Sequence, residues 1–241
     1  MSDATVIDIG RGGYPALRQA FNRVLHRLAG AVTADDVALA QDILELDDAD
    51  LQGTDEQTVT LLIDVALFSA DASGSRAIDR LAGEAKHDDA VDAAIAARLP
   101  HAFFSVFEVL DGHEAGGVRA RDLIAGGPDL HIMDEGLAAN VAAGALFAGR
   151  FVAIGPWHVG FGVVSSLARS EAVALMLAAD HPATGRTRLH EVVYRADIHG
   201  DNLAMHAIEP LIATLADAVD GAPTPVEDVA RRLARASSLA F

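Results

Sequence analysis

The sequence contains no cysteine and, among its 241 residues, a single lysine, Lys86. The lack of cysteine excludes disulfides, zinc sites built on thiolates and cysteine nucleophiles. Acidic residues outnumber basic ones, and the formal net charge is −17. A protein that binds nucleic acid or an anionic membrane surface needs a basic face, so this charge predicts neither as a partner.

Targeting segments and long apolar runs are also lacking. The first residues, Met1 to Ala4, have neither the basic nor the apolar part of a secretory signal. The longest nearly uncharged run, residues 137–149, is too short to span a bilayer. We therefore expect a cytoplasmic protein. The apolar segment 137–148 is a candidate homodimer interface, and a protein partner is the other expectation.

The composition that remains is globular, with 51% hydrophobic and 22% charged residues. Apolar residues repeat at helical spacing up to about residue 100, then at strand spacing, and at helical spacing again in the last third. The predicted fold class is α+β, with a helical region at 1–100, a small antiparallel β domain at 101–166 and a C-terminal helical region at 167–241.

Four helices are expected in the first hundred residues. The first starts at Pro15 and carries one apolar stripe. Thr33 and Thr54, each followed three residues later by Asp or Gln, predict capping boxes for the next two. The fourth is expected over 75–99. Four further helices are expected after the β domain, at 171–179, 187–197, 205–219 and from Pro225 onward.

Five short strands separated by glycine-rich turns are predicted in the middle of the chain. Five are too few for a sandwich and suit a small closed barrel or a curled sheet, which leaves no open edge. The predicted strands cover 103–110, 118–124, 130–133, 146–154 and 157–164.

Four pieces of this region also carry a resemblance: 107–110 (Phe-Glu-Val-Leu), 118–123 (Val-Arg-Ala-Arg-Asp-Leu), 144–154 and 157–167. In this order they resemble a segment, here 103–167, of uncharacterised bacterial proteins, some of which carry a cysteine-rich SEC-C zinc tail. Without cysteines this sequence lacks that tail, and the resemblance implies no catalytic residue.

The stretch 181–206 is rich in histidine and aspartate. Its metal-ligand candidates are His190, His199, Asp201 and His206, because neutral imidazoles and carboxylates bind zinc, iron or manganese. A histidine here is also a candidate general base. Their spacing matches no compact ligand signature, and histidines in caps, turns and the surface explain the same pattern.

Two glycine-rich features are candidate binding sites. The turn Gly10–Gly13 precedes a helix and can hold an anion on its backbone N–H groups, but the pattern favours an ordinary turn before a helix with proline at its start. In the last predicted strand His158, Gly160 and Gly162 share one face. Small residues there admit either a ligand or the close packing of a barrel.

No motif meets the requirements of an active site, so no catalytic residue and no cofactor other than a divalent metal is predicted. The sequence favours a non-enzymatic binding or regulatory protein that acts through protein contacts. Two alternatives remain open. One is a metal-dependent or histidine-based hydrolase or transferase using residues 181–206, and the other is a small-molecule sensor.

Overall fold

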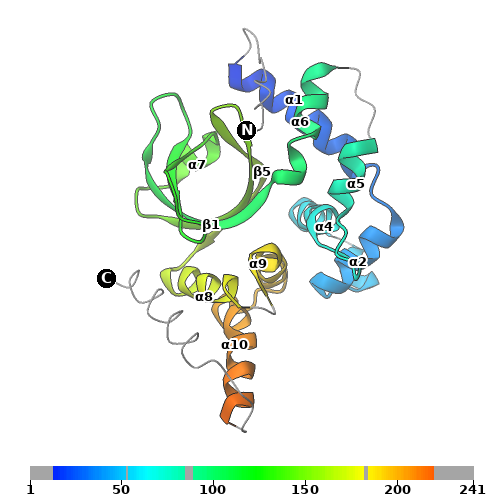
Figure 1. Ribbon diagram of the computed structural model, residues 1–241, viewed down its shortest axis with the longest axis vertical. Coiled ribbons are helices and arrows are strands. Elements are labelled where there is room, and N and C mark those ends of the chain that lie inside the picture. Colours follow the sequence, from blue (N-terminus) through cyan, green and yellow to red (C-terminus); the bar gives the residue numbers. More distant parts are fainter. Residues whose placement is uncertain (1–12, 53, 85–88, 182–183, 220–241) are drawn as a thin grey trace.

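The computed structural model describes residues 13–52, 54–84, 89–181 and 184–219. Helices pack on one closed five-stranded barrel, from the right and from below in the view of Figure 1. The α+β class is therefore confirmed. Residues 10–12 of the predicted anion-binding turn and the helix predicted from Pro225 lie outside the described residues.

The N-terminal helices follow the predicted stripes and caps. The capping box at Thr33 is confirmed, because its hydroxyl accepts the N–H of Asp36 and the Asp36 carboxylate accepts the N–H of Thr33. The helices are α1 (Gly13–Ala29), α2 (Ala34–Leu44), α3 (Asp48–Leu51), α4 (Glu56–Phe68), α5 (Ala77–Glu84) and α6 (Ala90–Ala96), followed by the 3-10 turn η2 (Leu99–His101).

Two predictions in this region are wrong. The cap of α4 is Asp55 and not Thr54, because the Thr54 hydroxyl donates to the Asp50 carbonyl while the Asp55 carboxylate accepts the N–H of Thr58 at 2.7 Å. The single helix expected over 75–99 is two helices. Asp89 adopts an extended backbone and its carboxylate accepts the N–H of Val91, so it starts α6 as a separate helix.

The barrel strands are β1 (Phe103–Gly112), β2 (Val118–Asp122), β3 (Leu130–Ile132), β4 (Leu146–Ile154) and β5 (Trp157–Leu167), closed in the order β1-β2-β3-β5-β4. The prediction of a purely antiparallel sheet is wrong at one pair, because β3 runs parallel to β5. A closed ring with an odd number of strands cannot be antiparallel at every pair, so closure itself requires this exception.

Helix α7 (Glu135–Asn140) connects β3 with β4. Leu137 of α7 packs into the barrel interior, as does Phe147 of β4. Two of the largest side chains of the segment proposed for dimerisation therefore point into the barrel, and the homodimer itself stays a prediction.

The barrel interior is filled by phenylalanine rings, with Phe107, Phe147 and Phe151 all at or below 1% exposure. Gly160 and Gly149 leave room for them. A Cβ at Gly160 would lie 3.0 Å from the Phe151 ring, and one at Gly149 would lie 3.1 Å from it. Barrel packing, the second of the two interpretations, therefore explains Gly160, whereas a Cβ at Gly162 would meet no atom within 4 Å.

The C-terminal helices cover the side of the barrel formed by β1 and β4, and α9 lies between the barrel and the α2–α4 pair (Figure 1). One apolar cluster joins these helices to both strands. Within the described residues, no helix is both long and apolar enough to cross a membrane. The elements are α8 (Arg169–Ala179), the 3-10 turn η3 (Arg186–Arg188), α9 (Leu189–His199) and α10 (Leu203–Val219).

Candidate functional site

Arg150 lies in the middle of β4, and its side chain leaves the barrel toward α4. Its neighbours in the strand, Gly149 and Phe151, face the barrel interior, so strand alternation turns Arg150 outward. The pairing of β4 with β5 shifts register between Gly149 and Phe151, and such bulges re-aim side chains beside functional sites. The Arg150 guanidinium lies 4.0 Å from the centroid of the Phe68 ring.

Arg150 forms a buried ion pair with Asp64 of α4. Its Nε donates to both carboxylate oxygens, at 2.9 and 3.0 Å, and the two side chains are only 5% and 7% exposed. A guanidinium has five N–H donors. The Nη2 atom of Arg150 is buried and has no partner among the described residues. Because an unsatisfied buried donor costs about 1–3 kcal/mol, this arginine has donor capacity that a ligand can use.

Two side chains of α9 complete the buried polar cluster around this pair. His190 is fully buried, and its Nε2 lies 2.9 Å from the Ser69 hydroxyl. Burial, and then the charge of Arg150, lowers the pKa of His190 well below its ordinary value, so the ring is neutral near pH 7. Burial also raises the pKa of Tyr194, with the Asp64 carboxylate as the next cause. The cluster ties α4, β4 and α9 together.

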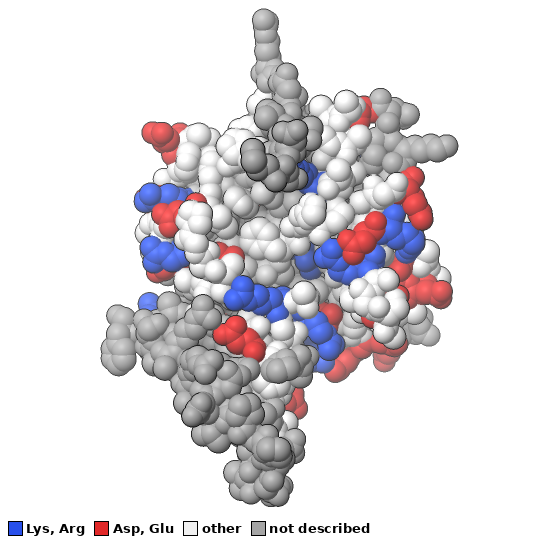
Figure 2. Space-filling view, viewed as in Figure 1, with Lys and Arg blue, Asp and Glu red and all other residues white. Residues whose placement is uncertain are grey.

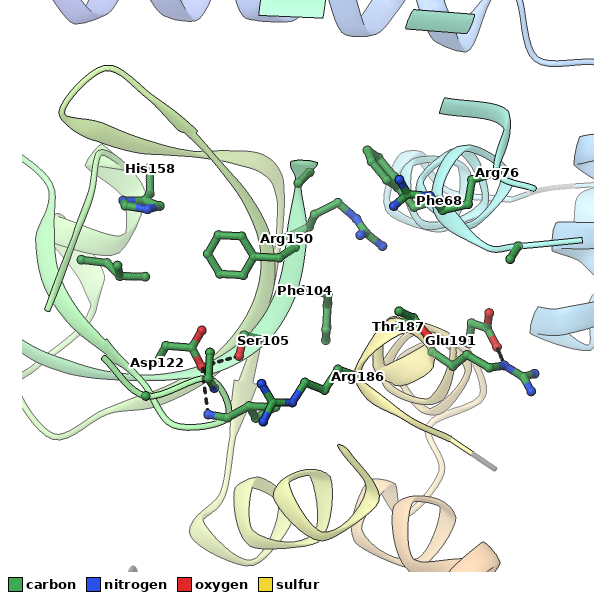
Figure 3. A pocket seen from close by; sticks show the side chains of 18 of the residues that line it. Phe68, Arg76, Phe104, Ser105, Asp122, Arg150, His158, Arg186, Thr187 and Glu191 are labelled. Carbon is green, nitrogen blue, oxygen red and sulfur yellow. Dashed lines mark hydrogen bonds and ion pairs between the residues drawn. The ribbon is translucent and has the colours of Figure 1, made fainter. Parts of the chain in front are cut away.

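A cavity of about 790 Å³ opens beside this cluster. We call it the Arg150 cavity. One end of the cavity lies at the mouth of the barrel, where β1, β3 and β5 begin and β2 ends. From there the cavity extends outside the barrel to α4 and η3. Figure 3 shows Ser105, Asp122 and His158 on the barrel side, and Phe68, Arg76, Thr187 and Glu191 on the helical side. Phe104 and Arg150 lie between the two sides.

Four arginines and two carboxylates line the cavity, in a protein whose net charge is −17. Two carboxylates line it, and one of them, Glu191, already accepts a hydrogen bond from Arg188 at 2.7 Å. Arg186 is half exposed, and its ion pair is with Asp180 at 4.0 Å. Arg76 pairs with Asp79 at 2.7 Å and Arg150 with Asp64 at 2.9 Å, so each arginine of the cavity already has one acidic partner. Its four arginines are Arg76, Arg150, Arg186 and Arg188.

Asp122, at the end of β2, is the other carboxylate of the cavity and is 4% exposed. Its Oδ1 accepts hydrogen bonds from the Ser105 hydroxyl at 2.6 Å and from the N–H groups of Ile124 and Ala125 at 2.9 and 2.8 Å. No arginine or histidine of the described chain forms an ion pair with it. It is a buried carboxylate that is hydrogen-bonded but has no counter-cation.

The four predicted metal ligands lie in three separate places. His190 is in the buried cluster, and the Nε2 of His199 lies 2.8 Å from the Leu44 carbonyl. Asp201 and His206 pair with each other at 3.0 Å. Over the described ranges no three His, Asp or Glu side chains are placed to hold a metal ion. Metal binding by this set stays a prediction.

The cavity residues themselves were missed from the sequence. One signal was present: Arg150 is the single charged residue in the apolar strand Leu146–Ile154, and a charge inside such a strand indicates a buried partner or a ligand. The other residues come from distant segments, and nothing in the sequence pattern brings Arg76, Asp122 and Arg186 together.

Strands β2 and β3 pair with each other and form one face of the barrel. Here the two arginines of β2 face acidic partners, Arg119 with Asp111 at 2.6 Å and Arg121 with Glu108 at 3.6 Å. Figure 2 shows acidic and basic side chains beside one another on the face in view. Fold type alone therefore assigns no ligand to this protein.

The chain matches, over residues 11–177, the family model described as "Family of unknown function (DUF7986)". It belongs to this family. The match spans more than half of the chain and includes Arg76, Asp122 and Arg150, whereas Arg186, Arg188 and Glu191 lie beyond it. No curated protein and no solved structure matches the chain. The expected membership in an uncharacterised family is confirmed, and the likeness to SEC-C proteins stays a prediction.

Proposed function

We propose that this protein binds a small organic anion in the Arg150 cavity and acts as a sensor or carrier of that molecule. The observation that carries the proposal is that Arg150 lines the cavity while the Nη2 of its buried guanidinium has no partner among the described residues. Arginine is the side chain best suited to carboxylates and phosphates, because its donors form a rigid planar fork.

The size and lining of the cavity support this function. Sites for small molecules have volumes of roughly 300–1,000 Å³ and combine apolar walls with a few polar groups. The Arg150 cavity, at about 790 Å³, fits this description. Its apolar wall is formed by Phe103, Phe104, Ile124 and Leu130.

The polar groups near the cavity favour binding over catalysis. Ser69 and His190 have the separation of a nucleophile and its base, but their exposed fractions are 3% and 0%, and neither lines the cavity. The Ser105 hydroxyl donates to Asp122, which accepts two backbone N–H groups as well. That carboxylate holds a turn, and its arrangement supports a positioning role over proton transfer.

The test is a binding screen on the intact protein. A panel of small carboxylates and phosphates is assayed by thermal shift, and positive compounds by isothermal titration calorimetry. We expect at least one anion to raise the melting temperature. Arg150→Lys keeps the positive charge that faces Asp64 but loses the planar guanidinium. It should therefore weaken anion binding about tenfold, which corresponds to the loss of roughly one charge-assisted hydrogen bond.

Arg121→Gln is the matched control, because Arg121 is an exposed arginine of the barrel that does not line the cavity. It should leave the affinity unchanged. A panel in which no anion binds, together with mass spectra of the native protein that show no bound small molecule, would count against the proposal.

A further inference from the structure

We infer that the ligand of the Arg150 cavity is a zwitterion, with a protonated amine that faces Asp122 and a carboxylate or phosphate that faces the arginines. This inference rests on the proposed function and makes it more specific. It follows from the charge of Asp122, from the groups that surround that carboxylate, and from the position of its charge relative to Arg150.

The first step is the charge of Asp122. Its three hydrogen bonds stabilise the carboxylate but do not neutralise it, and all three are accepted by Oδ1. A charge this deeply buried is costly unless a counter-charge accompanies it. Since the described chain supplies no ion pair to Asp122, a cationic group of the ligand is the missing partner.

The second step is the set of titratable groups around this end of the cavity. From β5, His158 faces it, and burial lowers the pKa of that imidazole, so the ring is neutral near pH 7. From η3, Arg186 lines the cavity with its ion pair directed to Asp180. From β1, Ser105 contributes only a hydroxyl. None of these groups neutralises Asp122.

The third step is the separation of the two poles. Asp122 pairs in register with Phe107, whose ring fills the barrel interior, so its carboxylate belongs to the barrel mouth. Arg150 pairs with Phe104 and leaves the barrel toward α4. The Phe104 side chain lies between the two charges (Figure 3). A ligand that fills the cavity therefore meets an acidic pole at one end, an apolar wall, and a basic pole at the other.

The test compares pairs of compounds that differ only in the amine. The probes are 5-aminopentanoate with pentanoate, phenylalanine with 3-phenylpropanoate, and 3-aminopropyl phosphate with propyl phosphate. In calorimetry we expect the amine member of at least one pair to bind about tenfold more tightly, the ratio that a hydrogen-bonded ion pair supplies. Comparison of the two carboxylate pairs with the phosphate pair shows whether the arginines prefer a carboxylate or a phosphate.

Asp122→Asn assigns the effect to this residue. It keeps an acceptor for the N–H groups of Ile124 and Ala125 and removes the charge, so the amine-containing and amine-free compounds should bind it equally. Asp129→Asn, which changes an exposed carboxylate near Arg119 on the same barrel, should keep the tenfold ratio. A tenfold ratio that survives in Asp122→Asn would overturn the assignment.

The wild-type comparison decides the inference even where Asp122→Asn does not fold. Equal affinity for both members of every pair in the wild-type protein would overturn the zwitterion while leaving anion binding intact. If neither member of any pair binds, and the anions of the wider panel do not bind either, then the proposed function itself fails.

Discussion

The barrel interior and the junction between the barrel and the helices are both buried, but they are built in opposite ways. The interior is packed with aromatic rings, and glycines in β4 and β5 leave room for the Phe151 ring. The junction contains a buried ion pair, a neutral histidine and a cavity of about 790 Å³. Packing alone explains the first region, whereas the second has polar groups that packing does not need.

A buried ion pair seldom stabilises a protein more than apolar side chains of the same volume would. The side chains that line a cavity also have fewer packing contacts with one another than those of the barrel interior. We therefore expect the junction to stabilise the fold less than a close-packed apolar region of the same size would. Departures from close apolar packing are expected at functional sites. The predictions that follow test this contrast.

The largest effect is expected from Asp64→Ala, which leaves the buried Arg150 without its counter-charge. Removing one member of a buried pair costs about 3–5 kcal/mol. Urea unfolding followed by circular dichroism measures the change. Asp111→Ala removes the partner of Arg119 in an exposed pair and should cost only about 0–1 kcal/mol. If both variants lose the same free energy of unfolding, the buried pair at the junction stabilises the fold no more than the exposed pair does, and this account is contradicted.

The next effect is expected from Gly160→Ala in the barrel interior. The added Cβ would lie 3.0 Å from the Phe151 ring, and overpacking of this kind costs about 1–3 kcal/mol. Adding Phe151→Leu to Gly160→Ala should return part of that loss, because the smaller side chain frees the space. Thermal unfolding of the two single variants and the double variant measures the coupling. Additive losses would show that the interior is less tightly packed than we describe.

A smaller effect concerns pH. The folded-state pKa of His190 lies below the ordinary value near 6.5, so as the pH falls the unfolded chain takes up the proton first. Above pH 6.5 the neutral His190 makes its full contribution to the free energy of unfolding. That contribution decreases as the pH falls below 6.5, by about 1 kcal/mol between pH 6.5 and 5.5. His190→Gln should flatten this slope in chemical denaturation, and the exposed His101→Gln should not. Identical slopes in the wild type and His190→Gln would contradict this account of the cluster.

The elements that the sequence predicts correctly are those that depend on local patterns. The strand Leu146–Ile154 agrees with its predicted range, because a run of apolar residues between glycine-rich turns is a local signal. The stripe of α1 and the cap at Thr33 are local as well, and both were predicted. The parallel β3–β5 pair was not, because it depends on closure of the whole ring.

The candidate site depends on contacts between distant segments, and for that reason it was missed. Arg150 and Asp64 are separated by 86 positions in the chain, and Ser69 and His190 by 121. No spacing rule brings such pairs together. Of the predicted metal ligands, only His190 belongs to the junction cluster, where its partner is a serine hydroxyl. The histidine-rich stretch was visible in the sequence, but the arginines around the cavity are the stronger signal in three dimensions.

The smallest effect on stability is expected from Arg186→Gln. This side chain is half exposed, and its ion pair with Asp180 is 4.0 Å long, so the free energy of unfolding should change by no more than about 0.5 kcal/mol. Anion affinity should nevertheless fall several-fold, because the residue lines the Arg150 cavity. Calorimetry and urea unfolding on the same preparation measure both quantities. A stability loss with unaltered affinity would assign Arg186 to structure alone.

The central claim is tested most directly by a crystal structure of the protein with the tightest anion of the screening panel. We predict that the acidic group of the ligand lies within hydrogen-bond distance of the Arg150 guanidinium, with the rest of the molecule extending along Phe104 toward the barrel mouth. A ligand bound elsewhere, with the cavity beside Arg150 unchanged from its ligand-free form, would contradict the account.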